Sequence, residues 1–126
     1  MNYTNLMKTI WTALYDSQTS VPEIVEKYFH PEYEQCINGV RMNRQEYIHH
    51  VQEQKKNMTV TAMDYKHVLE NGNELFALYY PRGKNKDLLP VEAEVLAYFQ
   101  FEDQQILRIH GQVRLLQGAQ ADVDMK

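Results

Sequence analysis

The spacing of apolar residues changes once along this chain, and this change limits the fold more than any other feature. Up to about Met58 the apolar residues recur every three or four positions, which is typical of helices buried on one side. Beyond that point they alternate with polar residues, as in strands with one face in water. The alternation predicts long strands at Thr59–Leu69, Glu74–Tyr80, Val91–Phe101 and Ile106–Leu116, and a shorter strand at Tyr33–Ile37.

Two helices are predicted before the first strand. The first covers about Thr4–Ser17, with Leu6, Met7, Ile10, Trp11 and Leu14 on one stripe. The second starts at the sequence SVPE, where Ser20 can cap the helix and Glu23 can complete a capping box. We expect Pro31 to end this helix.

A third helix is predicted between the short strand and the long ones. It starts at Asn43, with Glu46 three residues later as in a second capping box. The three helices must cover the apolar face of the sheet, because each apolar face needs a partner. The prediction is one α+β domain over residues 1–117 with a mostly antiparallel sheet, followed by a flexible tail at 118–126.

The turn sequences predict how the long strands pair. Asn71-Gly72 suits a two-residue hairpin that would set His67 opposite Phe76. A loop centred on Asn85-Lys86 would set Phe76 opposite Val95. A three-residue loop at 102–104 would set Ala97 opposite Ile109 and Glu92 opposite Arg114. The predicted inner face then comprises Met63, Tyr65, His67, Phe76, Leu78, Tyr80, Val95, Ala97, Phe99, Ile109, Gly111 and Val113.

Composition excludes several classes of function. The chain has 126 residues and a net charge of −4, so we expect neither nucleic acid nor a membrane as a partner. No stretch is apolar enough for a membrane span, and the N-terminus does not resemble a signal peptide, which predicts a cytoplasmic location. The run RGKNK at 82–86 is interpreted as a solvated turn. With one cysteine, Cys36, and no Cys/His metal spacing, we expect no disulfide, metal or cofactor.

The order of elements, with the phrases YFHPEYEQ and FEDQQI, resembles the NTF2-like superfamily and its SnoaL-like, polyketide cyclase-like branch. The resemblance covers Thr4 to about Leu116. It implies an NTF2-like (cystatin-like) cone in which a curved sheet wraps around the helices and encloses an apolar pocket. It also implies frequent dimers through the convex face of the sheet. Gln104 stands where a glycine is usual, so we expect slight strain in that turn.

The catalytic groups that the resemblance implies are missing here. Isomerases of the superfamily use a carboxylate near the end of the first strand, and the matching position is Ile37, or Cys36 after a slip of one. A second acid lies on the fourth strand, where this chain has Ala97, and an aromatic hydroxyl on the first helix is matched by Trp11. None of these side chains can transfer a proton to carbon or stabilise an oxyanion with a hydroxyl.

Other polar residues are candidates for the pocket. His67 is a weak candidate for a general base, and a structural or ligand-orienting role is the more common one for a buried histidine. Of the adjacent His49 and His50, one should face solvent and the other the mouth of the cone. His30 is expected at the end of a helix. The predicted ligand-binding residues are Trp11, Tyr33, Gln35, Tyr65, His67, Tyr80, Ala97, Phe99 and Gly111.

Two functions remain open from the sequence. In the first, the pocket holds a small apolar molecule, with at most weak isomerase- or cyclase-type chemistry by His67 or Tyr65. In the second, side chains fill the cone and the protein is a non-catalytic dimeric interaction module. Residues Leu96, Tyr98, Arg108 and His110 are the predicted two-fold interface on the convex face.

Overall fold

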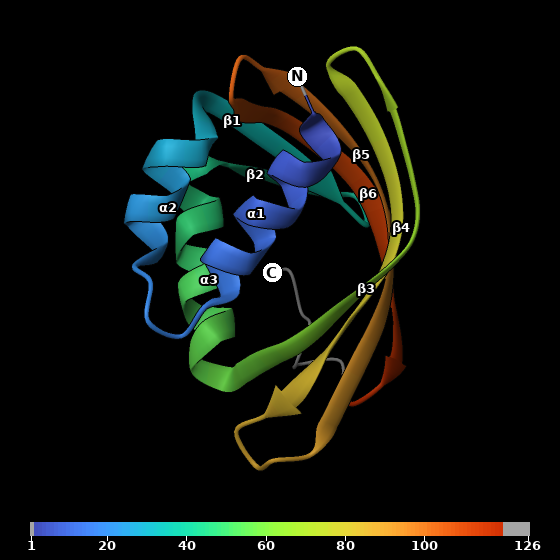
Figure 1. The fold of residues 1–126 in the computed structure, drawn as a ribbon. Coiled ribbons are helices and arrows are strands. Elements are labelled where there is room, and N and C mark those ends of the chain that lie inside the picture. The colour runs from blue at the N-terminus through green and yellow to red at the C-terminus, as the bar shows by residue number, and fades with distance from the viewer. Residues whose placement is uncertain (1, 120–126) are drawn as a thin grey trace.

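The computed structural model of the chain describes residues 2–119. The chain forms three helices and six strands within these residues. Figure 1 shows the helices lying in the hollow of a strongly curved sheet. The strand order is β2-β1-β6-β5-β4-β3, and all neighbours are antiparallel except β1 and β6. The predicted α+β architecture is therefore confirmed. The elements are α1 (Tyr3–Tyr15), α2 (Val21–Tyr28), β1 (Phe29–Ile37), β2 (Val40–Asn43), α3 (Arg44–Asn57), β3 (Met58–Asn71), β4 (Glu74–Asn85), β5 (Pro90–Glu102) and β6 (Gln105–Gln117).

The core lies between the helices and the concave face of the sheet. Strand β5 alternates without a break, and its inward side chains are buried at every second position from Val91 to Phe101. Helix α1 packs over this strand through Trp11, whose ring meets Phe99 edge-on at 5.9 Å between centroids. Full burial of each large apolar side chain contributes about 1.5–3 kcal/mol. The predicted inward residues Val95, Ala97, Phe99, Ile109 and Gly111 are all buried.

Side chains from distant parts of the chain hold both ends of α1. The Glu70 carboxylate at the end of β3 accepts hydrogen bonds from the backbone N–H groups of Tyr3 and Thr4, at 3.1 and 2.8 Å. At the other end, Lys55 Nζ donates to the carbonyl oxygens of Leu14 and Asp16, at 2.9 and 2.8 Å. These bonds satisfy backbone groups that a helix leaves unpaired at its ends. Helix α1 is thereby fixed across the sheet.

The second helix is shorter than predicted. Ser20 occupies the N-cap but makes no side-chain cap bond, so the predicted capping box with Glu23 is wrong. The chain enters β1 at Phe29, and Pro31 lies inside that strand. His30 is accordingly a strand residue rather than a helix-end residue, and its Nε2 lies 3.0 Å from Glu102.

Strand β2 was not predicted. Asn38 and Gly39 adopt positive φ angles of 53° and 80°, and they turn the chain so that β2 pairs with the end of β1. Its last residue, Asn43, then caps α3. Both bonds of the predicted capping box are present, because Asn43 Oδ1 accepts from the Glu46 N–H and Glu46 Oε1 accepts from the Asn43 N–H, each at 2.9 Å.

The predicted pairing of β3 and β4 is wrong by two residues next to the turn. Gly72 and Asn73 form the turn, so Asn71 faces Glu74 and Leu69 faces Phe76. The predicted pairing of β4 with β5 is wrong by three residues, and an odd shift turns the side chains of β4 to the other face. On β4 the residues Leu75, Ala77 and Tyr79 are buried, whereas the predicted inward residues Phe76, Leu78 and Tyr80 point outward.

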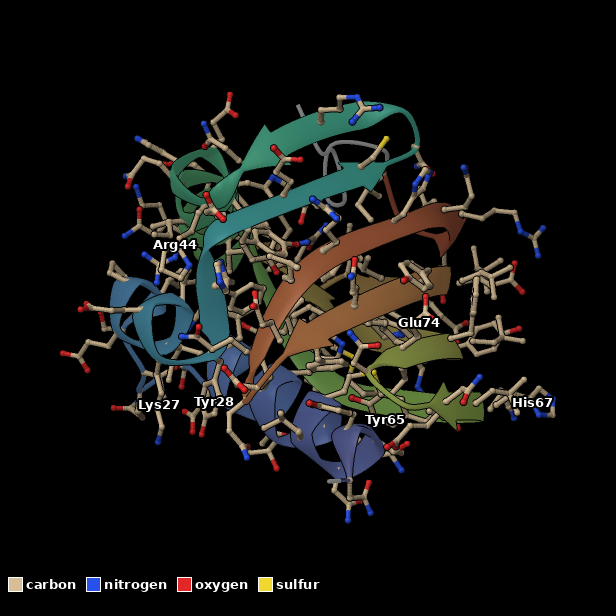
Figure 2. All side chains as sticks on the ribbon, turned by 90° about the horizontal axis from the view of Figure 1, so that it is seen from above. Lys27, Tyr28, Arg44, Tyr65, His67 and Glu74 are labelled. Carbon is tan, nitrogen blue, oxygen red and sulfur yellow. The ribbon has the colours of Figure 1, made fainter. Side chains whose placement is uncertain are left out.

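On β3, an irregularity in the pairing between Tyr65 and His67 reverses the alternation part-way along the strand. Met63 and Tyr65 pack against the core as predicted. Val68, which was not among the predicted inward residues, also packs against it. His67 is exposed, so its predicted inward position is wrong. Figure 2 shows His67 projecting outward from the edge of the sheet.

The other two hairpins also differ from the prediction. Strands β5 and β6 pair two residues away from the predicted register, with Ala97 opposite Gly111 and Glu94, not Glu92, opposite Arg114. A shift of two keeps each side chain on its face. Their turn uses two residues, and Asp103 rather than Gln104 takes the positive φ, 55°. Between β4 and β5, Tyr79 faces Val95 where Phe76 was expected to do so.

Two further sequence predictions concern the ends of the chain and membranes. The predicted tail at 118–126 falls almost entirely outside the described residues. Among residues 2–119, no helix is both long and apolar enough to cross a membrane.

The two N-caps form a matched pair for mutation. We expect Asn43→Ala to lower the free energy of unfolding by about 1 kcal/mol, because the Glu46 N–H loses its side-chain acceptor. Ser20→Ala should change it by no more than a few tenths, because Ser20 makes no side-chain cap bond. Denaturant unfolding followed by circular dichroism measures both values. Equal losses in the two variants would contradict the assigned caps.

Candidate functional site

A partly enclosed cavity of about 110 Å³ lies between the helices and the concave face of the sheet. Helices α1 and α3 contribute one wall, and strands β3 to β6 contribute the other, with β1 at the end. The cavity is lined by Trp11, Tyr15, Gln35, Ile37, Tyr47, His50, Gln54, Met58, Val60, Met63, Tyr79, Pro81, Arg82, Gly83, Val91, Ala93, Val95, Ala97, Ile109 and Val113.

Small side chains on the central strands leave this space open. Ala93 and Ala97 stand where larger residues of β5 would reach across to α1, and both line the cavity. Gly83 lies so close to β3 that an added Cβ would sit 2.0 Å from the Thr59 carbonyl oxygen. The space is somewhat smaller than the roughly 150 Å³ apolar cavity that holds one benzene ring. A ligand of that size would therefore extend toward the mouth.

Gln35 is the one buried polar side chain in the core of the described residues, with 4% of its surface exposed. Its Oε1 accepts a hydrogen bond of 2.7 Å from the Tyr33 hydroxyl. Its Nε2 lies 3.8 Å from the Met42 sulfur, which is a weak acceptor. The amide is thus held in one orientation at the wall of the cavity, and its N–H₂ group retains the capacity to donate to a bound molecule.

Three tyrosines line the cavity with their hydroxyl groups in apolar surroundings. The Tyr15 hydroxyl donates to Gln54 Oε1 at 3.1 Å. The Tyr47 side chain is buried, with 4% of its surface exposed. The Trp11 indole N–H lies near the Tyr79 hydroxyl and favours its ionised form slightly, but the geometry is too poor for a hydrogen bond and this N–H is buried without a partner.

Burial keeps these phenols neutral. Desolvation raises the pKa of Tyr15 to about 12. Desolvation, followed by repulsion among neighbouring phenolates, raises the pKa of Tyr33, Tyr47 and Tyr79 well above the ordinary value. At neutral pH the four side chains are hydrogen-bonding hydroxyls and cannot act as bases.

The charges around the cavity are few and of one sign. No aspartate or glutamate lines it, and Arg82 and His50 are the basic residues of the lining. No group of three or more His, Cys, Asp or Glu residues within the described part of the chain could hold a metal ion. The arrangement can enclose an apolar molecule and offer it hydrogen bonds, but it lacks a carboxylate that could shuttle a proton.

The predicted ligand-binding residues divide into three groups. Trp11, Gln35 and Ala97 line the cavity. Tyr33, Phe99 and Gly111 are buried beside it, and Tyr65 packs against Tyr79 and under the Lys8 ammonium. His67 and Tyr80 lie on the outside, and the Tyr80 hydroxyl donates to Glu94 at 2.7 Å.

Several lining residues were not among the predicted ligand-binding residues. Tyr47, His50 and Gln54 follow one face of α3 at spacings of three and four, and this pattern would have identified them. The expectation that one of His49 and His50 faces the mouth is confirmed, since His50 lines the cavity and His49 is exposed. Tyr79 was missed because its strand was predicted with the opposite face inward.

Solved structures with the same arrangement of elements share little sequence with this chain. A protein from Rhodopseudomonas palustris provisionally named an isomerase matches with a TM-score of 0.74 at 11% identity, covering 88% of this chain and 87% of its own. IdmH of Streptomyces antibioticus, provisionally named a polyketide cyclase, matches with a TM-score of 0.70 at 13% identity. The match covers 90% of this chain and 92% of IdmH.

A third match names the fold. It is a Catenulispora acidiphila protein in complex with trimethylamine, described as having a ketosteroid isomerase-like fold. The TM-score is 0.68 at 11% identity, and the match covers 84% of this chain and 82% of that protein. The chain has the NTF2-like fold. No protein-family model matches the sequence, and neither does any curated protein. At these identities the NTF2-like fold is shown, and the chemistry must be argued from the cavity itself.

The state of the buried tyrosines can be measured by absorbance at 295 nm as the pH is raised. We expect Tyr15→Phe and Tyr79→Phe to leave the absorbance change of the folded protein unaltered up to about pH 11, because burial holds both phenols neutral. A raised folded-state pKa adds stability that is present below pH 10 and lost as the pH rises further. Unfolding should therefore become easier above pH 10. A smaller absorbance change below pH 11 in Tyr79→Phe would show that this phenol is not buried as described.

Proposed function

We propose that the cavity binds a small uncharged molecule with an apolar body and one hydrogen-bonding group. The observation that carries this proposal is the lining itself, which combines apolar side chains and neutral hydroxyl and amide groups without a carboxylate. A charged ligand would lose its hydration without gaining a counter-charge of sufficient strength. A cation would in addition be repelled by Arg82.

Binding rather than catalysis accounts best for the polar groups. Proteins of the same fold are provisionally named isomerases and polyketide cyclases, which supports a pocket for compact carbon skeletons. In this chain the phenols, amides and indole of the lining are neutral groups that position a ligand, the basic residues are Arg82 and His50, and no carboxylate accompanies them. Tyr47 and Gln35 are the residues best placed to donate to such a ligand.

Trp11 makes the test specific, because it is the single tryptophan of the chain and lines the cavity. We expect cyclohexanol to change the Trp11 fluorescence in a saturable titration. Cyclohexane carboxylate and cyclohexylammonium, which have the same ring but opposite charges, should bind more weakly. Calorimetric titration gives the same order independently of fluorescence. Tighter binding of either charged ring would overturn the proposal.

Filling the cavity should abolish this binding. In Ala97→Phe the new ring occupies the cavity, and the affinity for cyclohexanol should fall about tenfold or more, equivalent to about 1.4 kcal/mol. Val60→Phe, at the half-buried edge of the cavity, is a second variant that disturbs the core less. Leu96→Phe, on the opposite face of β5, is the matched control and should bind normally. Unchanged affinity in the folded Ala97 and Val60 variants would place the ligand elsewhere.

We also propose that the convex face of the sheet forms a homodimer. Aligned residues of neighbouring strands form rows across this face. We call the two central rows the apolar band. One row consists of Phe76, Tyr98, His110 and Cys36, and the other consists of Leu78, Leu96 and Gln112. Charged rows border the band on both sides, with Glu74, Gln100, Arg108 and Glu34 on one side and the paired Glu94 and Arg114 on the other.

The exposure of the apolar band supports this proposal. Phe76 and Leu96 are 52% and 51% exposed, and Phe76 contacts the Tyr98 ring at 5.4 Å. An apolar centre with a polar rim is the usual composition of a protein interface. Of the predicted interface residues, Leu96, Tyr98 and His110 belong to the band and Arg108 to its rim.

Leu96→Glu should convert the dimer into a monomer, because it would bury a carboxylate without a partner at the two-fold contact. Light scattering after size exclusion measures the mass. Leu69→Glu is the control, since Leu69 is 74% exposed and lies at the far end of β3. A monomeric wild-type protein, or equal effects of both variants, would contradict the proposed interface.

A further inference from the structure

The hairpin between β4 and β5 exposes two leucines at its tip. Leu88 and Leu89 are 75% and 58% exposed, more than most apolar side chains of the described residues. Figure 1 shows this hairpin extending beyond the end of α3, so that its tip stands clear of the helices. A large apolar side chain at a projecting tip gains nothing from the fold itself, which suggests a contact outside the molecule.

Leu88 also has a backbone conformation that leucine rarely adopts. Its φ angle is 63°, in the left-handed region where glycine and asparagine are preferred. Such a conformation costs about 1–3 kcal/mol for a residue of this kind, and strained residues of this type concentrate at functional positions. The chain therefore holds an aliphatic side chain at the tip against its own conformational preference.

Four hydrogen bonds to Asn85 order the backbone of the tip. Asn85 Oδ1 accepts from the N–H groups of Asp87 and Leu89, at 2.9 and 3.0 Å. The Asn85 carbonyl accepts from the Leu88 N–H, and the Asn85 N–H donates to the Leu89 carbonyl, each at 2.9 Å. The N–H groups of Asp87, Leu88 and Leu89 are thus already paired, and paired groups lose little when they leave water.

The hairpin carries a positive charge in a chain that is negative as a whole. Residues 82–90 include three cations, Arg82, Lys84 and Lys86, and one carboxylate, Asp87, which gives a net charge of +2 against −4 for the chain. All four are exposed, and among residues 2–119 none of them forms a salt bridge. These cations are free to meet anionic groups around the point where the leucines make contact.

We propose that this hairpin tip docks on an anionic lipid surface, with Leu88 and Leu89 in the boundary between headgroups and acyl chains. Lys84 and Lys86 then face the lipid phosphates. A pair of exposed aliphatic side chains beside unpaired lysines is the combination by which peripheral proteins bind such surfaces. The expectation of no membrane partner used the charge of the whole chain, and the local charge of this hairpin has the opposite sign.

The same hairpin borders the cavity. Arg82 and Gly83 on β4 and Val91 on β5 line it, so docking would bring the cavity close to the lipid surface. An apolar ligand could then pass between the bilayer and the cavity without crossing bulk water. The docking itself does not depend on the proposed ligand binding, and it is tested without any ligand.

Co-sedimentation with vesicles tests the proposal on the full-length chain. The probes are vesicles of phosphatidylcholine alone and of phosphatidylcholine with phosphatidylserine. We expect the protein to bind the mixed vesicles at low ionic strength, with at least a tenfold lower partition coefficient on phosphatidylcholine alone. Binding should weaken as salt is added, because the charges are exposed. Lys84→Gln with Lys86→Gln should lower the partition coefficient about tenfold or more, since each lysine near such a surface contributes about 1 kcal/mol.

The apolar contribution is tested by Leu88→Asn with Leu89→Ser. Asparagine tolerates the left-handed conformation, so this variant should fold at least as well as the wild type while losing vesicle binding. Leu69→Ser is the matched control, because Leu69 is as exposed as Leu88. Leu69 lies near the C-terminal end of β3, whereas the N-terminal end of β3 pairs with β4 beside the Leu88 tip. Equal binding to both kinds of vesicle, no binding to either, or equal loss in Leu69→Ser would overturn the proposal. The proposal would also be overturned if Leu88→Asn with Leu89→Ser had a smaller molecular mass in solution than the wild type. The tip would then form a contact between protein molecules.

Discussion

The contact between α1 and strand β5 is the interaction on which the rest of the structure depends. Strand β5 is central in the sheet and turns an apolar side chain inward at every second position from Val91 to Phe101. The larger residues, Phe99 and Phe101, lie under α1, where Trp11 meets Phe99 edge-on and Tyr3 stacks on Phe101. The smaller ones, Ala93 and Ala97, lie where α1 no longer fills the space. One strand thus defines both the packed core and the cavity.

The chemistry of the cavity follows from this arrangement. The side chains that reach into it come from the aromatic residues of the core, and their hydroxyl groups are buried with them. Burial raises the pKa of Tyr15, Tyr33, Tyr47 and Tyr79, so these four phenols are neutral at neutral pH. At the two strand positions where the resemblance implied carboxylates, this chain has Ile37 and Ala97. The cavity therefore offers hydrogen-bonding groups without a carboxylate that could transfer a proton.

The sequence predicted the architecture well because alternation and helical spacing are properties of single elements. It predicted the inward residues of β5 and β6 correctly despite a register error, since that error was of two residues. It failed on β4, because the predicted pairing of β4 with β5 was wrong by three residues and an odd shift turns a strand over. It also failed on His67, because an irregularity in β3 changes the alternation locally. Such an irregularity depends on contacts with the neighbouring strand, and one sequence does not reveal it. The three lining residues on α3 could have been found from their spacing.

The irregular pairing of β3 has a consequence for how molecules of this protein behave toward one another at high concentration. Strand β3 is an edge of the sheet, and a long regular edge would offer its unpaired backbone groups to another chain and promote fibrous aggregation. The two irregularities, after Val60 and after Tyr65, interrupt that edge, and Asp64 and Lys66 add charge beside it. The opposite edge is β2, which has only four residues. Both borders of the sheet are thereby poor templates for the addition of a further strand.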